Sequence, residues 1–312
     1  MIKKENIEKF YDYFDFVGNL LYTNYGKTYI EGINEAFSYL LDDEFEGEYS
    51  LEDVDLIYIE KDKVTDVSFQ PEEVRKSVQL GLLKGYKHTF SSNALITPDT
   101  IGIFIGYLVK KLYVNKEITS LLDPLIGSGN LVYSIINYLE KDVKVYGVDE
   151  DLLKCNIARN LGDLMDVENE IFYQDTLTYF DQGFDLIVTD MPYVEDDKDY
   201  LPYQIINHHF QSLKAGGYFV GLIDNDFFEK NNSQVFREEI EKKGYIFGLI
   251  KLSETLFKNN PKSILILRRT DEVVEKRSDF LLVDLPSFND IEGFNSTINQ
   301  IDTWMLDRKD DL

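Results

Sequence analysis

Four short apolar runs, each ending in an aspartate, constrain the fold of this chain more than any other feature. They cover residues 118–123, 144–149, 170–175 and 184–190. Helical patterns at residues 130–141 and 150–166 separate the first three runs. Alternating strands and helices predict an α/β fold, in which a mostly parallel sheet carries helices on both faces. The four carboxylates of Asp123, Asp149, Asp175 and Asp190 are then expected along one edge of that sheet.

The first run leads into a tight turn with Gly127 and Gly129, and then into an apolar helix. Glycine has no Cβ and can take positive φ, so the backbone of such a turn can approach a ligand closely. The helix that follows points free N–H groups toward the same place. Open parallel sheets bind their ligands outside the carboxyl ends of the strands. The turn therefore marks the predicted ligand site.

A nucleoside ligand accounts for the first three acids. Asp149 is placed to accept both ribose hydroxyls, with Glu150 as the neighbour that could replace it. Asp175 could accept from the exocyclic amine of an adenine, and Asp123 would face the rest of the ligand. A dinucleotide fingerprint needs a third glycine where this chain has Val132. Asp123 would also repel a pyrophosphate but attract an ammonium group. The residues favour S-adenosylmethionine over NAD.

The remaining segments predict a helical beginning and further strands at the end. Residues 7–22, 29–43 and 71–86 have helical spacing, whereas the apolar run at 56–64 is ambiguous. Thr97 can cap the next apolar helix, and Pro98 can occupy the first position of that helix. After Asp190 we expect helices at 203–214 and 233–244, and strands at 218–223, 245–252 and 263–269. The last two could form a long hairpin on the sheet edge, followed by a strand at 279–288 and a closing helix at 294–307.

Charge and cysteine content narrow the function classes. The net charge of −25 repels a phosphate backbone over most of the surface, so nucleic acid is a disfavoured partner. Lys84, Lys87 and His88 form a modest basic cluster near the domain joint, and they are the best place for a nucleic-acid contact. The single cysteine, Cys155, and the lack of an apolar signal segment or membrane span suit the cytoplasm. We expect no metal at His208 and His209, and an aromatic-rich helical region favours a homodimer.

Several motifs resemble those of a known family. Residues 123–130, DPLIGSGN, resemble motif I of class I S-adenosylmethionine-dependent methyltransferases in its amino-methyltransferase form. The tetrapeptide at 190–193, DMPY, resembles motif IV of N6-adenine methyltransferases, and Thr97-Pro98 resembles their upstream cofactor-contact motif. This is the gamma order of motifs. Residues 213–228 and 251–269 are similar to modification subunits of type I restriction systems. The whole chain is similar to small bacterial adenine-specific methyltransferase-like proteins with a helical N-terminal domain.

The resemblance, which covers residues 88–285, implies two domains and a site. Residues 1–90 would be mainly helical. Residues 91–312 would be a Rossmann-like methyltransferase domain whose last strand is antiparallel. The implied cofactor-binding residues are Thr97, Pro98, Asp123, Pro124, Gly127, Ser128, Gly129, Asn130, Asp149, Glu150, Asp175 and Thr176. The implied catalytic residues are Asp190, Met191, Pro192 and Tyr193, with Tyr193 and Phe257 stacking on the substrate.

In the family's mechanism, the Asp190 side chain and the Met191 carbonyl would accept hydrogen bonds from a target amine and orient its lone pair. Tyr193 would stack on a flipped base. The chain departs from the pattern in three ways. Met191 replaces a proline, the next loop carries Glu195, Asp196, Asp197 and Asp199, and no long recognition segment follows. Adenine in nucleic acid, an amine of a protein or small molecule, and an inactive cofactor-binding scaffold therefore remain three alternatives.

Overall fold

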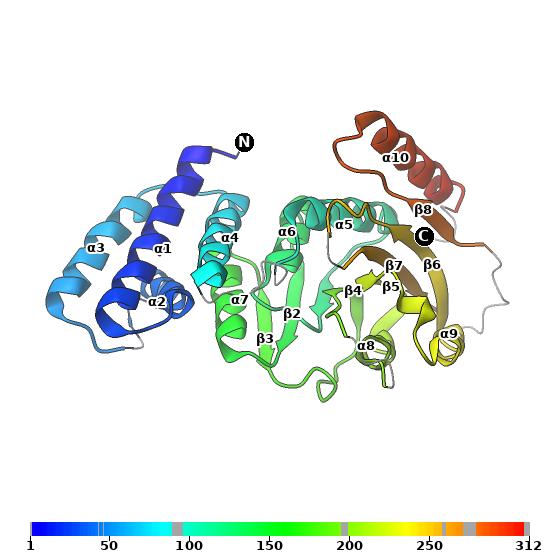
Figure 1. The fold of residues 1–312 in the computed structure, drawn as a ribbon, viewed down its shortest axis with the longest axis horizontal. Coiled ribbons are helices and arrows are strands. Elements are labelled where there is room, and N and C mark those ends of the chain that lie inside the picture. Colours follow the sequence, from blue (N-terminus) through cyan, green and yellow to red (C-terminus); the bar gives the residue numbers. More distant parts are fainter. Residues whose placement is uncertain are drawn as a thin grey trace. The chain divides into compact units, whose positions relative to one another are not determined.

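Four helices fill the N-terminal part of the chain (Figure 1, blue to cyan). They are α1 (Lys4–Tyr25), α2 (Tyr29–Asp42), α3 (Leu51–Thr65) and α4 (Pro71–His88). The ambiguous run at 56–64 is thus helical and lies inside α3. Ser50 caps α3 by accepting a hydrogen bond from the Asp53 N–H at 3.2 Å. Pro71 begins α4, where its missing N–H costs nothing.

The chain divides into two units, each built from two separate segments. The computed structural model describes residues 2–42, 44–45, 47–88, 96–194, 199–257, 260–270 and 279–308. The first unit comprises Met1–Ile103 and Ile126–Tyr173, and the second comprises Phe104–Leu125 and Gln174–Leu312. The predicted domain boundary near residue 90 stays a prediction.

The first unit joins the helical region to two strands. It contains α6 (Asn130–Leu139), β2 (Lys144–Asp149), α7 (Leu152–Leu164) and β3 (Asn169–Tyr173). β2 and β3 are parallel, with Val145 opposite Asn169 and Asp149 opposite Tyr173. α7 packs on both strands and also on α2 and α4. The helical region therefore shares one packed core with the strand that ends in Asp149.

The second unit holds the other strands. They are β1 (Ser120–Asp123), β4 (Phe184–Asp190), β5 (Leu213–Asp224), β6 (Gly244–Lys251), β7 (Lys262–Arg269) and β8 (Leu281–Asp284). Their order is β1-β4-β5-β7-β6-β8. β1, β4 and β5 are parallel, β7 is antiparallel to both β5 and β6, and β8 is parallel to β6. The sheet thus contains the predicted antiparallel strand, β7, but it is not the last strand, because the parallel β8 follows it in the chain. The hairpin of β6 and β7 is not at the edge, because β8 adds one more strand beyond it.

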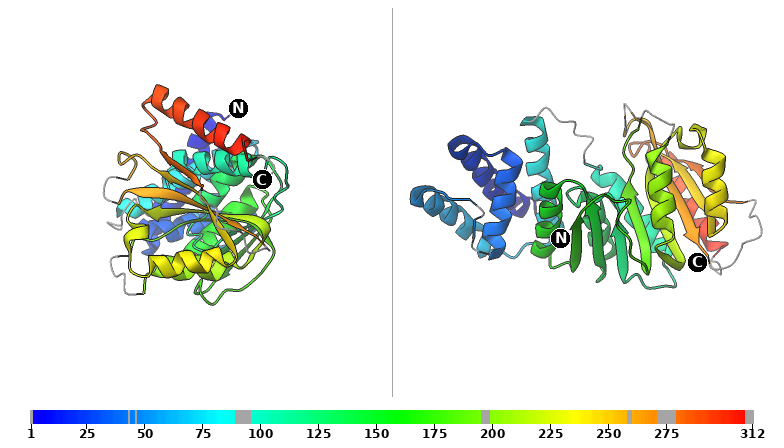
Figure 2. Two further views of the ribbon diagram at one scale, coloured as in Figure 1. Left: turned by 90° about the vertical axis from the view of Figure 1, so that its right-hand side faces the viewer. Right: turned by 90° about the horizontal axis from the view of Figure 1, so that it is seen from below.

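Helices cover both faces of this sheet. α8 (Leu201–Phe210) and α9 (Ser233–Glu241) lie on one face, and α10 (Ile291–Leu306) lies on the other (Figures 1 and 2). α5 (Asp99–Leu112) shares the face of α10, where Asp302 accepts hydrogen bonds from Tyr107 and from Lys111. The short turn η2 (Phe227–Glu229) follows β5. With both faces covered, the carboxyl ends of β1 and β4 are left to loops, which suits a ligand site there. Within the described part of the chain, no helix has the length and apolarity that crossing a membrane requires.

Candidate functional site

The turn between β1 and α6 has the backbone that its two glycines allow. Gly127 has φ 53° and Gly129 has φ 81°, both in the left-handed region. A Cβ on Gly129 would meet the Tyr133 ring at 2.5 Å, so space as well as φ requires glycine there. Gly129 precedes α6, and no side chain caps that helix. Pro124 and Ser128 are buried within the same turn. The turn therefore offers close backbone approach and a helix N-terminus, as the sequence predicted.

Asp149, at the end of β2, holds this turn in place. One carboxylate oxygen accepts the Gly127 N–H at 2.9 Å, and the other accepts the Asp151 N–H at 2.9 Å. Its predicted substitute, Glu150, is exposed. Tyr86 of α4 lies near this acid, and burial together with the charges of Asp151 and Asp149 raises the pKa of Tyr86 to about 12. A carboxylate oxygen can accept more than one hydrogen bond, so Asp149 keeps capacity for ribose hydroxyls.

A buried arginine of α4 holds the first residue of α6 in place by a hydrogen bond. The sequence did not predict this arginine as a site residue. Arg75 is 0% exposed and donates to the Asn130 side-chain oxygen at 2.6 Å. It also donates to Asp99 at 3.1 Å and to Glu72 at 2.6 Å. Burial opposes its charge, but the hydrogen bonds to Glu72 and Asp99 still keep the pKa of Arg75 above its usual value. The Asn130 amide in turn donates to the Thr97 carbonyl at 2.9 Å.

This network brings together three of the predicted cofactor-binding residues of the first unit. Thr97 is buried, and Pro98 lies directly before α5 rather than inside it, because its carbonyl accepts the Ile101 N–H at 2.9 Å. Asn130 opens α6. The first unit thus connects Thr97, Pro98 and Asn130 to the helical region through one arginine.

In the second unit, two of the predicted acids end neighbouring parallel strands. Asp123 ends β1 and is 1% exposed, and its carboxylate accepts the Leu125 N–H at 3.1 Å. Asp190 ends β4, and Leu122 pairs with Ile187 between the two strands. Parallel neighbours bring their carboxyl ends to one edge, so these two side chains belong to the same rim. That all four acids share one crevice stays a prediction.

Asp175 and Thr176 follow β3 in a turn. Asp175 is exposed and accepts the Leu177 N–H at 2.8 Å, which is the turn chemistry expected of an aspartate. The buried Thr176 hydroxyl lies 2.8 Å from Nε2 of His209. Burial first, and the charge of His208 second, lower the pKa of His209 to about 3, so its ring is neutral near neutral pH. Among the described side chains, no group of three or more His, Cys, Asp or Glu could hold a metal ion.

The DMPY segment follows β4 directly. Met191 is 2% exposed, and its N–H donates to the Leu222 carbonyl at 2.9 Å. Pro192 is exposed and Tyr193 is 50% exposed, so its ring is accessible to a flat partner. Phe257 is partly exposed in the segment between β6 and β7. Of the acidic loop, Asp199 is exposed, whereas Glu195, Asp196 and Asp197 lie outside the described residues.

One lysine contacts both acceptors of this segment, and it was not predicted. Lys262, the first residue of β7, makes an ion pair with the Asp190 carboxylate. The same ammonium donates to the Met191 carbonyl at 2.8 Å. Directly opposite Lys262 in the sheet lies Asp224, which is 6% exposed. Neither carboxylate oxygen of Asp224 has a hydrogen-bond partner among the described residues. Burial chiefly raises the pKa of Asp224, and the charges of Asp226 and Asp190 add to the rise.

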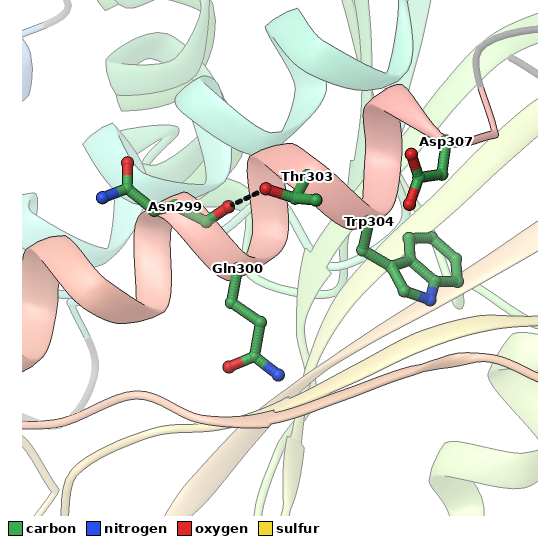
Figure 3. A pocket seen from close by; sticks show the side chains of 5 residues that line it. All are labelled: Asn299, Gln300, Thr303, Trp304 and Asp307. Atoms are coloured by element: carbon green, nitrogen blue, oxygen red, sulfur yellow. Dashed lines mark hydrogen bonds between the residues drawn. The ribbon is translucent and has the colours of Figure 1, made fainter.

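A shallow hollow of about 410 Å³ lies elsewhere on the second unit, along α10 (Figure 3). The residues that line it are Asn299, Gln300, Thr303, Trp304 and Asp307. None of them is a predicted site residue, and none contributes a titratable pair suited to catalysis. The candidate site is therefore defined by the side chains at the strand ends and not by this hollow.

Two family models match parts of this chain. Residues 82–303 match the family model described as N-6 DNA Methylase, and residues 8–86 match the YtxK N-terminal helical domain. The uncharacterized protein YtxK of Bacillus subtilis is 30% identical, over 99% of this chain and all of its own length. A Listeria monocytogenes structure assigned to the class I S-adenosylmethionine-dependent methyltransferases is also 30% identical. It covers 97% of this chain and 100% of its own, with a TM-score of 0.84.

A more distant structure shares the fold. The type I restriction-modification methyltransferase subunit of Streptococcus thermophilus is 16% identical and has a TM-score of 0.59. It covers 91% of this chain and 73% of its own. Together these likenesses confirm the predicted fold class and the resemblance stated from the motifs. The roles of the individual site residues stay predictions.

Proposed function

The chain belongs to the N-6 DNA methylase family, and we propose that it methylates the exocyclic N6 amine of adenine in nucleic acid. It is an S-adenosylmethionine-dependent methyltransferase, as its family and its similarity to the Listeria structure indicate. One observation carries the proposal. The Asp190 carboxylate and the Met191 carbonyl converge on a single amine nitrogen, that of Lys262. Two acceptors that converge on one nitrogen are what the orientation of a target amine requires.

The residues of the turn fit the cofactor. Backbone N–H groups at the start of α6 and the positive φ of Gly127 and Gly129 allow close approach of the amino-acid part. Asp149 retains acceptor capacity for the ribose, and the buried Asp123 supplies negative charge for an ammonium group. When bound, S-adenosylmethionine supplies a methyl group on a positively charged sulfur.

The chain's own residues would then prepare the acceptor. Asp190 and the Met191 carbonyl take the two N–H bonds of the target amine, which points its lone pair away from them. The Asp190 carboxylate is also the nearest proton acceptor for the nitrogen once a methyl group has been added. Tyr193, half exposed, offers one aromatic face to a flipped base, and Phe257 offers a second. None of these steps requires a covalent bond between the protein and its substrate.

The second candidate is methylation of an amine in a protein or small molecule. The net charge of −25 favours it, because so acidic a surface attracts cationic partners and repels a phosphate backbone. The third candidate is a cofactor-binding scaffold without transfer. It is favoured by Met191, which stands where the family has a proline and makes the loop less rigid.

Transfer from labelled S-adenosylmethionine to DNA, RNA and cell extract tests the three candidates. Transfer to DNA or RNA supports the first, and transfer only to protein or small molecules in the extract supports the second. Binding without transfer, unchanged by Asp190→Ala, supports the third. Asp181→Ala is the matched control, because Asp181 is exposed and precedes the same strand. It should keep the activity of the wild type.

We also propose that the enzyme is cytoplasmic, bacterial and dimeric. The bacterial relatives and the single buried thiol of Cys155 support the first two points. α3 leaves Leu56, Tyr58 and Ile59 exposed by 41%, 52% and 55%, which supports a homodimer through the helical region. Light scattering of the wild type and of Ile59→Ser tests the dimer. A monomeric wild type would exclude it.

A further inference from the structure

Lys262 contacts the two groups that the proposed reaction needs for its substrate. Its ammonium has three N–H donors, of which one goes to Asp190 and one to the Met191 carbonyl. A target amine cannot use those acceptors fully while the lysine holds them. Productive binding therefore requires Lys262 to move, and its charge needs a partner in the new position, because an unpaired buried ammonium is costly.

Asp224 is the partner that the fold supplies. It faces Lys262 directly across the antiparallel pair of β5 and β7. Opposite residues in such a pair have Cβ atoms about 4.5–5.5 Å apart and point to one face. Asp190 pairs with Leu222, so Asp224, two residues further along β5, points to the same face as Asp190. Lys262 can thus reach either carboxylate from one backbone position.

The unpaired carboxylate of Asp224 in the free protein is what we expect if Lys262 pairs with Asp224 only when a substrate amine is bound. Its carboxylate oxygens are buried and have no hydrogen-bond partner in the described part of the chain. Leaving a buried polar group without a hydrogen bond destabilises the folded protein, so the retention of an unpaired Asp224 needs a reason. The charged groups that act on Asp224 are Lys262, Asp226, Lys230 and Asp190. Asp224 and Asp226 in turn act on the phenol of Tyr200.

We infer that Lys262 is a positioning residue with two alternative partners: Asp190 with the Met191 carbonyl in the free protein, and Asp224 when a substrate amine enters. The inference rests on the proposed function for the identity of the amine. In the first position the lysine holds in place the loop that Met191 leaves less rigid. In the second it releases both acceptors and neutralises a carboxylate that is otherwise unpaired.

Asp190→Asn tests the inference without any substrate, because it removes the charge that competes for Lys262. The carboxyl 13C resonance of Asp224, assigned with Asp224→Asn, reports the pKa of that group. We measure the pKa of Asp224 in four proteins: the wild type, Lys262→Met, Asp190→Asn, and the double variant that carries both substitutions. In the Asp190→Asn background, loss of Lys262 should raise the pKa of Asp224 by about one unit or more. In the wild-type background the rise should be smaller. An equal or smaller rise in the Asp190→Asn background would overturn the inference.

A second measurement keeps Lys262 and so does not depend on the folding of Lys262→Met. The Lys262 ammonium 15N resonance, assigned by its loss in Lys262→Arg, should follow the titration of Asp224 in Asp190→Asn and not in the wild type. The same response in both proteins would contradict the switch. Both measurements use the free protein, so a failure of the proposed function leaves their outcome unaffected.

Kinetics then separate positioning from a structural role. In transfer to an adenine-containing oligonucleotide, Lys262→Met should lower kcat, because Asp190 and the loop lose their anchor. It should also lower KM, because the acceptor amine no longer competes with an ammonium. Lys262→Arg, which keeps the charge, should restore part of kcat. A rise in KM with kcat unchanged would overturn the inference.

Discussion

Arg75 provides the sharpest test of how the helical region supports the cofactor turn. Replacing it with methionine keeps much of the apolar stem but removes every donor to Glu72, Asp99 and Asn130. Removing one partner of a buried ion pair typically costs about 3–5 kcal/mol. The side chains of Glu72 and Asp99 are 16% and 27% exposed, so water relieves part of that cost. We therefore expect about 3 kcal/mol of destabilisation, at the lower end of this range.

Thermal unfolding and calorimetry measure the two consequences. A chain of 312 residues has an unfolding entropy of about 0.65 kcal/mol/K, so 3 kcal/mol corresponds to a melting point lowered by about 5 °C. The Asn130 side chain also loses the hydrogen bond from Arg75 and keeps the one to the Thr97 carbonyl, which loosens the start of α6. We expect Arg75→Met to bind S-adenosylmethionine about tenfold more weakly than the wild type at a temperature where both are folded.

Two variants control this experiment. Arg237→Met makes the same chemical change on the exposed surface of α9 and should alter the unfolding free energy by less than about 0.5 kcal/mol. Arg75→Lys keeps the charge but lacks the planar guanidinium that reaches three acceptors at once. Its free energy of unfolding should therefore lie between those of the wild type and Arg75→Met. A melting point of Arg75→Met within about 1 °C of the wild type, with unchanged cofactor affinity, would refute the reasoning.

Three further variants test other parts of the structure. Gly129→Ala should cost about 1–3 kcal/mol in denaturant unfolding, because φ is 81° and the Tyr133 ring blocks the new Cβ. The pKa of His209 is lowered to about 3, so the free energy of unfolding of the wild type should decrease as pH falls below about 6.5. Over the same pH range, the melting temperature of His209→Gln should fall less than that of the wild type. The pKa of Asp224 is raised, so its ionisation should lower the free energy of unfolding as pH rises above about 3.9. In calorimetric scans, the melting temperature of Asp224→Asn relative to that of the wild type should therefore increase from acidic to neutral pH.

The sequence predicted the regular parts of the fold because their patterns are local. Apolar runs that end in aspartate identified β1, β2 and β4, and the glycine turn identified the approach to α6. The prediction that the last two strands form a hairpin on the sheet edge was wrong, because the order of strands in a sheet depends on contacts between distant parts of the chain. Nothing in the spacing of residues 245–269 indicates that β7 inserts between β5 and β6, or that β8 then covers β6.

The side chains that support the site were harder to predict than those that form it. Arg75 lies among charged residues at helical spacing, which is also the pattern of a solvated helix face. Lys262 and Asp224 lie at the ends of apolar strands, where a charge usually meets water. Only the sheet register shows that they face each other. Long-range pairing of this kind needs coordinates, because one chain carries no signal that joins residues so distant.

Mass spectrometry of nucleosides from DNA and RNA treated with the enzyme and S-adenosylmethionine tests the central claim most directly. If Asp190 and the Met191 carbonyl hold an adenine amine, the wild type produces N6-methyladenine. Asp190→Ala should produce none while binding the cofactor with unchanged affinity. No methylated adenine from the wild type, or equal amounts from the wild type and Asp190→Ala, would contradict the account.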